Sequence, residues 1–377
     1  MPTRIIQAAT HSRFRVSLGH TGRSGHQKGQ TVSLLGLMKN TGCYAAIRAF
    51  RQDALTVLTA HGVVPPVSQL PWQPLREQVD VETFARQIDV ISQHHEWVDL
   101  DGALRHLRGE HRYRNPVLMT FDDGYRNNLD IALPVLEAQG IKPLLFVTTG
   151  YLNNARPFWF DRFDYVIQQI DRPWTLRVDT REFTFRPGVA SQMARVYQQL
   201  RGYAKRKGWE DHEFHDFFSD ACRELESYTG KSLAVIQADD PWSATVSGDQ
   251  LRDAVHRNAI DVGSHTIDHM RIDKLNPQDR MRQLVESRRI LEEITGKPCI
   301  SFCYPNGDWD HQSTVDVAQA GYQIAFSVDG GLNRPGTNLY TIRRVFVPTR
   351  FSEAQVEALS CGALSLKEDF NNWLSSV

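Results

Sequence analysis

The sequence of 377 residues has few cysteines and no long apolar run. No uninterrupted apolar stretch approaches the ~20 residues that a membrane-spanning helix requires, so we predict no transmembrane segment. The five cysteines are scattered and odd in number, which favours reduced thiols over a disulfide framework. These absences predict a soluble protein of the cytoplasm.

Acidic residues are absent from the first 52 positions, where eight Lys and Arg residues occur. Residues 10–30 are rich in Gly, Ser, His and Arg without hydrophobic periodicity, so we expect them to be disordered. We predict that residues 1–50 form a basic segment with one short helix, and that residues 51–377 form the globular domain. Residues 32–38 are too short and interrupted for a signal peptide, and the sequence leaves open whether translation begins at Met38.

The whole-chain charge excludes some classes of partner. The net charge of −1 gives no reason to expect nucleic acid or an anionic membrane as the main partner. No Gly-x-Gly-x-x-Gly or Walker-type loop follows any apolar run, which argues against a nucleotide-binding site. A hydrophobic content of 41% is typical of a soluble globular protein.

Short apolar runs alternate with segments of helical periodicity. The apolar runs cover residues 55–59, 117–121, 144–147, 260–262, 299–303 and 324–328. The helical segments cover residues 81–94, 128–139, 278–295 and 312–320. This alternation predicts βαβ units and a parallel sheet. Polar residues follow the runs, as expected for a β/α barrel, although an open doubly wound sheet fits the pattern equally well.

Residues 155–244 interrupt this alternation. An aromatic-rich stretch at 157–163 is followed by an alternating segment at 174–185, which predicts a β-hairpin, and by a charged helical portion at 190–228. We predict a mainly helical insertion on an α/β domain, bordering the functional site. Two further helices are expected at 352–359 and near 366–374.

Two adjacent carboxylates, Asp122 and Asp123, end the apolar run at 117–121 and precede Gly124. Carboxylates at a buried strand end are costly to desolvate unless a cation pairs with them. His265 and His269 follow another apolar run and are four residues apart, so a helix beginning there would place both imidazoles on one face. Two histidines and one carboxylate leave a position for water, as in catalytic zinc sites, and the second carboxylate is available as a general base.

With these residues the chain resembles the polysaccharide deacetylase family, the NodB-homology fold of carbohydrate esterase family 4. The matching motifs are Thr120-Phe121-Asp122-Asp123-Gly124 and His265-Thr266-Ile267-Asp268-His269. The resemblance implies a distorted (β/α)7 barrel that removes acetyl groups from N-acetylated sugars with a divalent metal, which we expect to be Zn²⁺. It implies that Asp122 is the general base and that Asp123, His265 and His269 hold the metal.

The third motif departs from the common family pattern. Many members carry an Arg before the turn that here reads Tyr304-Pro305-Asn306-Gly307, whereas this chain has Cys303. The turn is similar to that of the circularly permuted poly-N-acetylglucosamine deacetylases, in which the acid histidine follows the first strand. By this resemblance His61 is the general acid, and Arg343 or Arg344 is a candidate replacement for the missing Arg. We expect substrate or oxyanion contacts from Tyr304, Pro305, Asn306 and Trp309.

The sequence therefore predicts a metal-dependent hydrolase that removes N-acetyl groups from an amino sugar in a polysaccharide, an oligosaccharide or a lipid-linked precursor. Metal-activated water would react, with an Asp base and a His acid. Two alternatives stay open: a metal-dependent hydrolase of a small cyclic amide or ureide, and a non-catalytic carbohydrate-binding relative.

Overall fold

The computed structural model of the protein describes residues 34–76 and 78–365. The disorder expected at 10–30 and the helix expected near 366–374 lie outside the described residues. Between residues 34 and 76 and between 78 and 365, no helix has the length and apolar composition needed to cross a bilayer.

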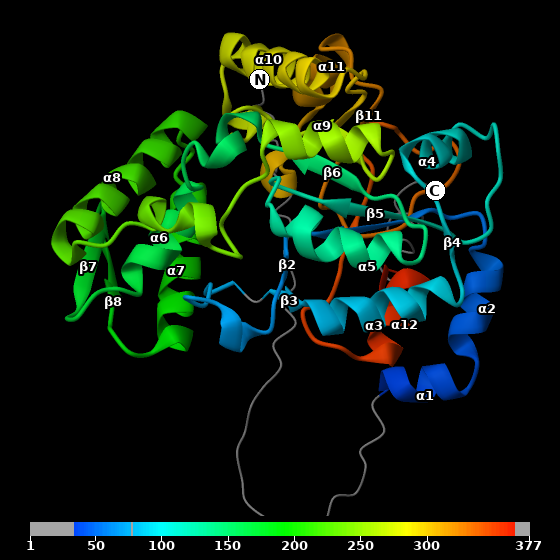
Figure 1. Ribbon diagram of the computed structural model, residues 1–377, viewed down its shortest axis with the longest axis horizontal. Helices are drawn as coiled ribbons and strands as arrows, with labels where there is room; N and C mark the ends of the chain where they lie inside the picture. Colours follow the sequence, from blue (N-terminus) through cyan, green and yellow to red (C-terminus); the bar gives the residue numbers. More distant parts are fainter. Residues whose placement is uncertain (1–33, 77, 366–377) are drawn as a thin grey trace, which may run out of the picture.

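A curled parallel sheet forms the centre of the molecule (Figure 1). Its strand order is β11-β10-β9-β6-β5-β1-β12, and β4 pairs with the start of β5. The strands are β1 (Thr56–Ala60), β4 (Glu96–Trp97), β5 (Pro116–Phe121), β6 (Leu144–Val147), β9 (Asp261–Ser264), β10 (Ser301–Cys303), β11 (Ile324–Phe326) and β12 (Val345–Phe346). The six predicted apolar runs correspond to β1, β5, β6, β9, β10 and β11.

The chain just before β12 connects the two ends of the sheet. Ile342 exchanges backbone hydrogen bonds with β11, accepting from Ser327 and donating to Ala325 (both 2.9 Å). Three residues later β12 pairs with β1, with Leu58 opposite Val345. Residues 342–346 therefore contact β11 at one end of the sheet and β1 at the other. The seven parallel strands form the distorted (β/α)7 barrel that the family resemblance implied.

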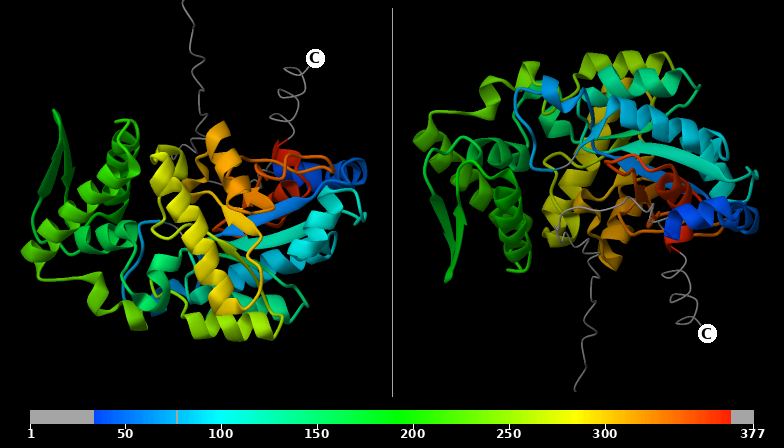
Figure 2. Two further views of the ribbon diagram at one scale, coloured as in Figure 1. Left: turned by 90° about the horizontal axis from the view of Figure 1, so that it is seen from above. Right: turned by 90° about the horizontal axis from the view of Figure 1, so that it is seen from below.

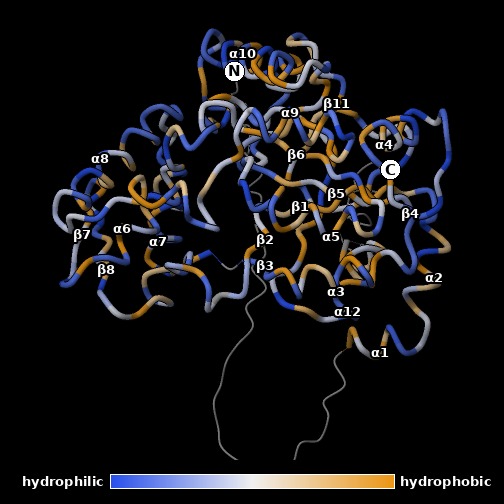
Figure 3. The backbone as a smooth tube through the Cα atoms, viewed as in Figure 1, coloured by the Kyte–Doolittle hydropathy of each residue, from blue (hydrophilic) through white to orange (hydrophobic). Residues whose placement is uncertain are grey.

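Alternation along each strand divides the core into two apolar layers. Inward-facing residues such as Val57, Leu118 and Phe146 fill the barrel. The intervening residues, such as Leu58 and Met119, pack against the surrounding helices. Those helices are α3 (Val81–Ser92), α5 (Leu133–Glu137), α9 (Gly248–His256), α10 (Pro277–Thr295), α11 (His311–Gln319) and α12 (Glu353–Ser360). Helix α4 (Leu100–Leu107) packs instead with the inner layer. Figure 3 shows the apolar colour concentrated in the strands and on the inner sides of these helices.

Two local features differ from the sequence-based expectation. The expected helix at 128–139 begins with a π-helical turn, Asn128–Ala132, and continues as the short helix α5. The N-terminal region has two helices where one was expected, α1 (Leu34–Asn40) and α2 (Cys43–Phe50). They are separated by Gly42, whose φ of 74° lies in the left-handed region and breaks the helix.

The predicted insertion stands beside the barrel, on the side away from α1 and α2 (Figures 1 and 2). Its elements are α6 (Trp159–Ile167), the antiparallel hairpin β7 (Trp174–Val178) and β8 (Arg181–Phe185), α7 (Ala190–Lys205) and α8 (Asp211–Thr229). The charged helical portion is thus two helices, and the break contains Gly208 with a φ of 72°. The insertion encloses an aromatic core of its own, which includes Phe163, Tyr197 and Phe218.

Candidate active site

Reactive side chains gather at the carboxyl ends of the barrel strands. Asp122 and Asp123 follow β5, His265 follows β9, and His61 follows β1. Because all the strands are parallel, these ends lie at one mouth of the barrel, where the active sites of β/α barrels are built.

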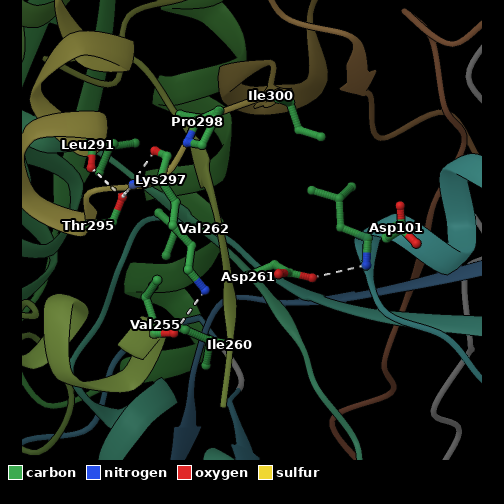
Figure 4. Close-up of a pocket in the computed structure, with 12 residues that line it drawn as sticks. Asp101, Val255, Ile260, Asp261, Val262, Leu291, Thr295, Lys297, Pro298 and Ile300 are labelled. Carbon is green, nitrogen blue, oxygen red and sulfur yellow. Dashed lines mark hydrogen bonds between the residues drawn. The ribbon is translucent and has the colours of Figure 1, made fainter. Parts of the chain in front are cut away.

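A pocket of about 160 Å³ lies at the opposite end of β9 and β10, away from these side chains (Figure 4). Its lining is largely apolar and includes Ile260 and Ile300. The carboxylate of Asp261 accepts the Leu100 N–H at 3.1 Å and pairs with Lys142 at 2.7 Å. This acid is already satisfied by the fold, so the pocket offers no comparable set of reactive groups.

Asp122 is held by Arg344 in a two-pronged ion pair. Nη1 of Arg344 donates to Oδ1 and Nη2 donates to Oδ2, each at 2.7 Å. The guanidinium is fixed by further bonds from Nε to the Ser327 carbonyl (2.7 Å) and from Nη1 to the hydroxyls of Thr59 (3.0 Å) and Thr120 (3.2 Å). This fork geometry fixes the carboxylate in both position and orientation.

Arg344, and not Arg343, is therefore the arginine that holds Asp122. Ile342 faces the barrel interior, and Arg344, two residues later, lies on the same side. Cys303 stands beside this pair, with its Sγ 3.1 Å from Nη2 of Arg344 and 3.7 Å from Oδ1 of Asp122. The thiol fills space next to the ion pair without replacing it.

Electrostatics keep Asp122 ionised. Its burial, at 3% exposed, alone would raise the pKa of the carboxyl, but the charge and hydrogen bonds of Arg344 outweigh burial and the net pKa is lowered. The pKa of Arg344 is raised in turn, because Asp122 overcomes the effect of its own burial. The pair thus presents a carboxylate that stays charged at neutral pH.

Asp123 is adjacent to Asp122 in sequence, but its side chain has different neighbours in the structure. Its two carboxylate oxygens are buried and accept no hydrogen bond from the described part of the chain. Nε2 of His265 lies 3.5 Å and Nε2 of His269 lies 3.3 Å from Oδ1 of Asp123. Burial would raise the pKa of Asp123, but the two imidazoles hold it well below its usual range.

The three side chains fit a metal ion. Their donor atoms lie within 4.8 Å of one another, and Asp123 has no other partner among the described residues. Nδ1 of His265 lies 2.8 Å from the Cys303 carbonyl, which fixes the tautomer that leaves Nε2 free to ligate. A second cluster, Asp122 with His265 and Cys303, fits less well, because Arg344 occupies both oxygens of Asp122.

The histidines converge through a loop and not through the helix that their spacing suggested. Thr266 and His269 have φ values of 69° and 58°, which interrupt any helix between the two ligands. Asp123, with φ 75°, also leaves the strand conformation. Left-handed non-glycine residues are strained, least so Asn and Asp. Among the described residues, those with a positive φ other than Gly, Asn and Asp are Thr266 and His269, both in this loop.

Buried polar contacts hold this loop in its strained form. Oε1 of the fully buried Gln283 accepts from the N–H groups of Ile267 (2.9 Å) and Asp268 (3.0 Å). Gly150, after β6, donates its N–H to the Ile267 carbonyl at 2.8 Å. A Cβ at Gly150 would come within 2.6 Å of that oxygen, so the close approach requires glycine.

His61 stands at the rim of the site. Its ring lies parallel to Phe346, with ring centres 6.0 Å apart. Burial lowers the pKa of His61, while the charges of Asp123 and Asp122 act in the raising direction. The next residue is Gly62, where a Cβ would lie 2.6 Å from the Trp242 ring, so glycine allows the indole to pack against this turn.

The structure gives Tyr304 a framework role in place of the predicted substrate contact. Its ring is fully buried, its hydroxyl donates to the Tyr340 carbonyl at 3.0 Å, and its N–H donates to Phe326 at 3.1 Å. Both of its donors are therefore engaged within the barrel. Pro305 is buried in the turn that follows.

Asn306 and Trp309 remain candidates at the mouth. Asn306 has a φ of 57° in the turn after Pro305. Trp309 is 39% exposed, and its Nε1 donates to Asp329 at 2.9 Å. An exposed indole of fixed orientation at the barrel mouth is suited to packing against a sugar ring.

The insertion supplies an aromatic wall behind His269. Phe160 packs edge-to-face on the His269 ring with centres 5.2 Å apart, and Phe158 does so at 5.8 Å. Both phenyl rings are buried, as is Trp159, which stacks on Phe218 of α8 at 4.4 Å. These aromatics pack the site from behind, and none of the three is an open sugar platform.

Comparison with known proteins agrees with this geometry. The family model described as polysaccharide deacetylase matches residues 110–325, more than half of the chain. The chain belongs to the polysaccharide deacetylase family. YxkH of Bacillus subtilis (strain 168), whose name places it in the same family, is 22% identical over 138 residues. That alignment covers 36% of this chain and 49% of YxkH, so the chain matches about half the length of this curated relative.

Solved structures of deacetylases share the fold of this polysaccharide deacetylase family member. The Streptococcus pyogenes deacetylase PplD, solved with acetate, superposes with a TM-score of 0.52 at 12% identity, covering 81% of this chain and 98% of PplD. IcaB from Ammonifex degensii gives 0.52 at 21% identity, covering 82% of this chain and 97% of IcaB. At these identities the likeness establishes the barrel architecture.

Proposed function

We propose that this polysaccharide deacetylase family member is a hydrolase that removes N-acetyl groups from an amino sugar in a polysaccharide, an oligosaccharide or a lipid-linked precursor. The observation that carries the proposal is the division between two adjacent carboxylates. Asp122 is ionised and oriented by Arg344, whereas Asp123 faces two imidazoles with unsatisfied oxygens. A binding protein has no need for such a division, which disfavours the non-catalytic alternative.

The protein's own residues divide the proton transfers of amide hydrolysis. Asp122 is the general base that takes a proton from the attacking water, and its lowered pKa keeps it unprotonated at neutral pH. Arg344 holds the carboxylate in place. His61 is the general acid that protonates the leaving nitrogen. Burial lowers the pKa of His61, and the charges of Asp123 and Asp122 partly oppose that effect. Asn306 and Trp309 contact the substrate at the mouth.

Asp123, His265 and His269 hold a divalent metal, which we assign as Zn²⁺ because two imidazoles and one carboxylate are typical of catalytic zinc. When bound, the ion supplies Lewis acidity to the acetyl carbonyl and to water. The carbohydrate class of substrate is supported by the family match. The acetate in PplD is the product expected of a deacetylase, which supports acetyl as the group removed.

The decisive experiment measures acetate release from oligomers of N-acetylglucosamine. Asp122→Asn keeps the shape of the side chain and removes the base, so we expect a loss of at least about 100-fold in kcat. Asp101→Asn, an exposed acid near the opposite end of the barrel, is the matched control and should retain full activity. Full acetate release by Asp122→Asn, or none by the wild type loaded with Zn²⁺, would reject the proposed function.

A further inference from the structure

Arg76 is a second arginine of the site, and no sequence motif pointed to it. It lies in the irregular segment between β2 (Val63–Val64) and β3 (Val79–Asp80). Its Nη2 donates to Asp161 of α6 at 2.7 Å and approaches the Tyr125 hydroxyl at 3.3 Å. Tyr125 in turn donates to the other oxygen of Asp161 at 2.6 Å. The guanidinium thus joins the insertion to the residue that directly follows Gly124.

Aromatic contacts place the same guanidinium beside the reactive groups. Arg76 lies over the Phe160 ring at 4.8 Å and over the Trp242 ring at 5.5 Å. Phe160 packs on His269, and Trp242 packs against the turn at Gly62, next to His61. Arg76 is therefore held between the wall behind one predicted metal ligand and the turn that carries the predicted acid.

The two arginines of the site differ in how many of their donors the protein uses. Arg344 is fully buried, and all three of its nitrogens bond within the barrel. The Arg76 side chain is 23% exposed, and within the described residues only its Nη2 has a hydrogen-bond partner. Its Nε and Nη1 groups are available on a guanidinium that cannot easily move. The pKa of Arg76 is raised by Tyr125, Asp161 and Asp123 against the effect of burial, so the group stays cationic.

We propose that Arg76 binds substrate: its Nε and Nη1 donate hydrogen bonds to a sugar oxygen of the N-acetylated unit at the Asp122–Asp123 centre, while Asp161 and Tyr125 fix the guanidinium. This inference rests on the proposed function. It assigns the irregular segment and the insertion a joint task, because one supplies the donor and the other supplies the carboxylate that orients it. A rigid donor loses little conformational freedom when the sugar binds.

Binding and catalysis together test the proposal. In the Asp122→Asn background, binding of the N-acetylglucosamine tetramer and of free acetate is measured by calorimetry with Zn²⁺ present. Arg76→Lys keeps a cation beside Asp161 but removes the planar guanidinium with its Nε and Nη1 donors. We therefore expect the Kd of the tetramer to rise about tenfold while the Kd of acetate is unchanged. In the active enzyme, KM for the tetramer should rise by a similar factor with little change in kcat.

Control variants separate a binding role from a structural one. Arg162→Lys alters the neighbouring arginine on α6, which pairs with Glu226 within the insertion, and should leave both Kd values unchanged. Asp161→Asn retains an acceptor for Arg76, so it should raise the tetramer Kd less than Arg76→Lys does. An unchanged tetramer Kd in Arg76→Lys overturns the proposal, and so does an equal weakening of tetramer and acetate. Absence of tetramer binding to the Asp122→Asn enzyme itself would instead reject the proposed function.

Discussion

The barrel and the insertion each bury a pair of carboxylates, but with opposite electrostatic results. In the barrel, the pKa values of Asp122 and Asp123 are lowered. In the insertion, burial dominates and raises the pKa of Asp161 to about 6 and that of Asp164 to about 7. All four side chains are nearly inaccessible to solvent. Burial alone therefore does not determine the charge of an acid here.

The difference comes from what each region places around the acid. In the barrel, Nη1 and Nη2 of Arg344 both donate to Asp122, and two imidazoles lie beside Asp123. In the insertion, Asp164 accepts mainly neutral donors, the Leu75 N–H and the Gln168 amide, both at 2.9 Å. Asp161 does pair with a cation, but only one nitrogen of Arg76 reaches it, and burial together with the charge of Asp123 outweighs that contact. Cationic partners favour the charged carboxylate more strongly than neutral donors do. We expect catalytic and metal-binding acids in the barrel, and in the insertion acids that position other groups or support the fold.

The largest expected effect separates the two barrel acids by their metal binding. Asp123→Asn removes an anionic ligand, so we expect Zn²⁺ affinity to fall by more than about 100-fold and acetate release to be lost with it. Asp122→Asn should lose acetate release while it retains Zn²⁺. Metal content after dialysis, measured by elemental analysis, checks both variants. If both lost Zn²⁺ equally, the division of labour between the two carboxylates would be wrong.

Removal of the cation beside Asp122 should make that acid resemble those of the insertion. In Arg344→Met the pKa of Asp122 rises, because burial then acts without opposition. The base is protonated at a higher pH, so the acid limb of kcat/KM moves toward neutral pH and the rate at pH 7 falls by about 100-fold. The pH–rate profile is the measurement.

The same variant has a stability consequence whose sign follows from the lowered pKa. In the wild type, ionised Asp122 contributes stability above its unfolded pKa, and this contribution is lost as the pH falls through the folded pKa. Arg344→Met leaves a buried carboxylate unpaired and should cost about 3–5 kcal/mol at neutral pH, and less in acid. Arg343→Met, altered one residue away, is the matched control. A pH–rate profile of Arg344→Met that matches the wild type would contradict the assigned role of Arg344.

Sequence periodicity predicted the parallel strands well because they are buried and regular, whereas the barrel was implied by the family resemblance. The runs around β5 and β9 end at the reactive residues, so the motif at Asp122 and the motif at His265 could be located before their geometry was known. The choice between Arg343 and Arg344 could not be made, because β12 is only two residues long and gives no alternation to count. Its register depends on pairing with β1, which lies far away in sequence.

Other parts of the site depend on tertiary contacts that no local pattern encodes. The turn between His265 and His269 is held by Gln283 from α10, and the four-residue spacing alone favoured a helix. Arg76 lies in an irregular segment, and only the folded insertion brings Asp161 to it. Tyr304 directly follows β10, just as the site residues follow other strands. Its hydroxyl and its N–H are nevertheless both bonded to backbone carbonyls of the barrel.

The smallest expected effect concerns the insertion alone. Because the pKa of Asp164 is raised to about 7, its stability contribution is present below the unfolded pKa and is lost as the pH rises through about 7. Asp164→Asn removes that pH dependence. We therefore expect the variant to be more stable at pH 8, relative to the wild type, than it is at pH 5, by on the order of 2 kcal/mol. Urea unfolding at the two pH values measures this difference, and Asp216→Asn, an exposed acid of α8, should show none. The same pH dependence in Asp164→Asn and in the wild type would mean that Asp164 is charged at neutral pH, and the contrast between barrel and insertion would then no longer hold.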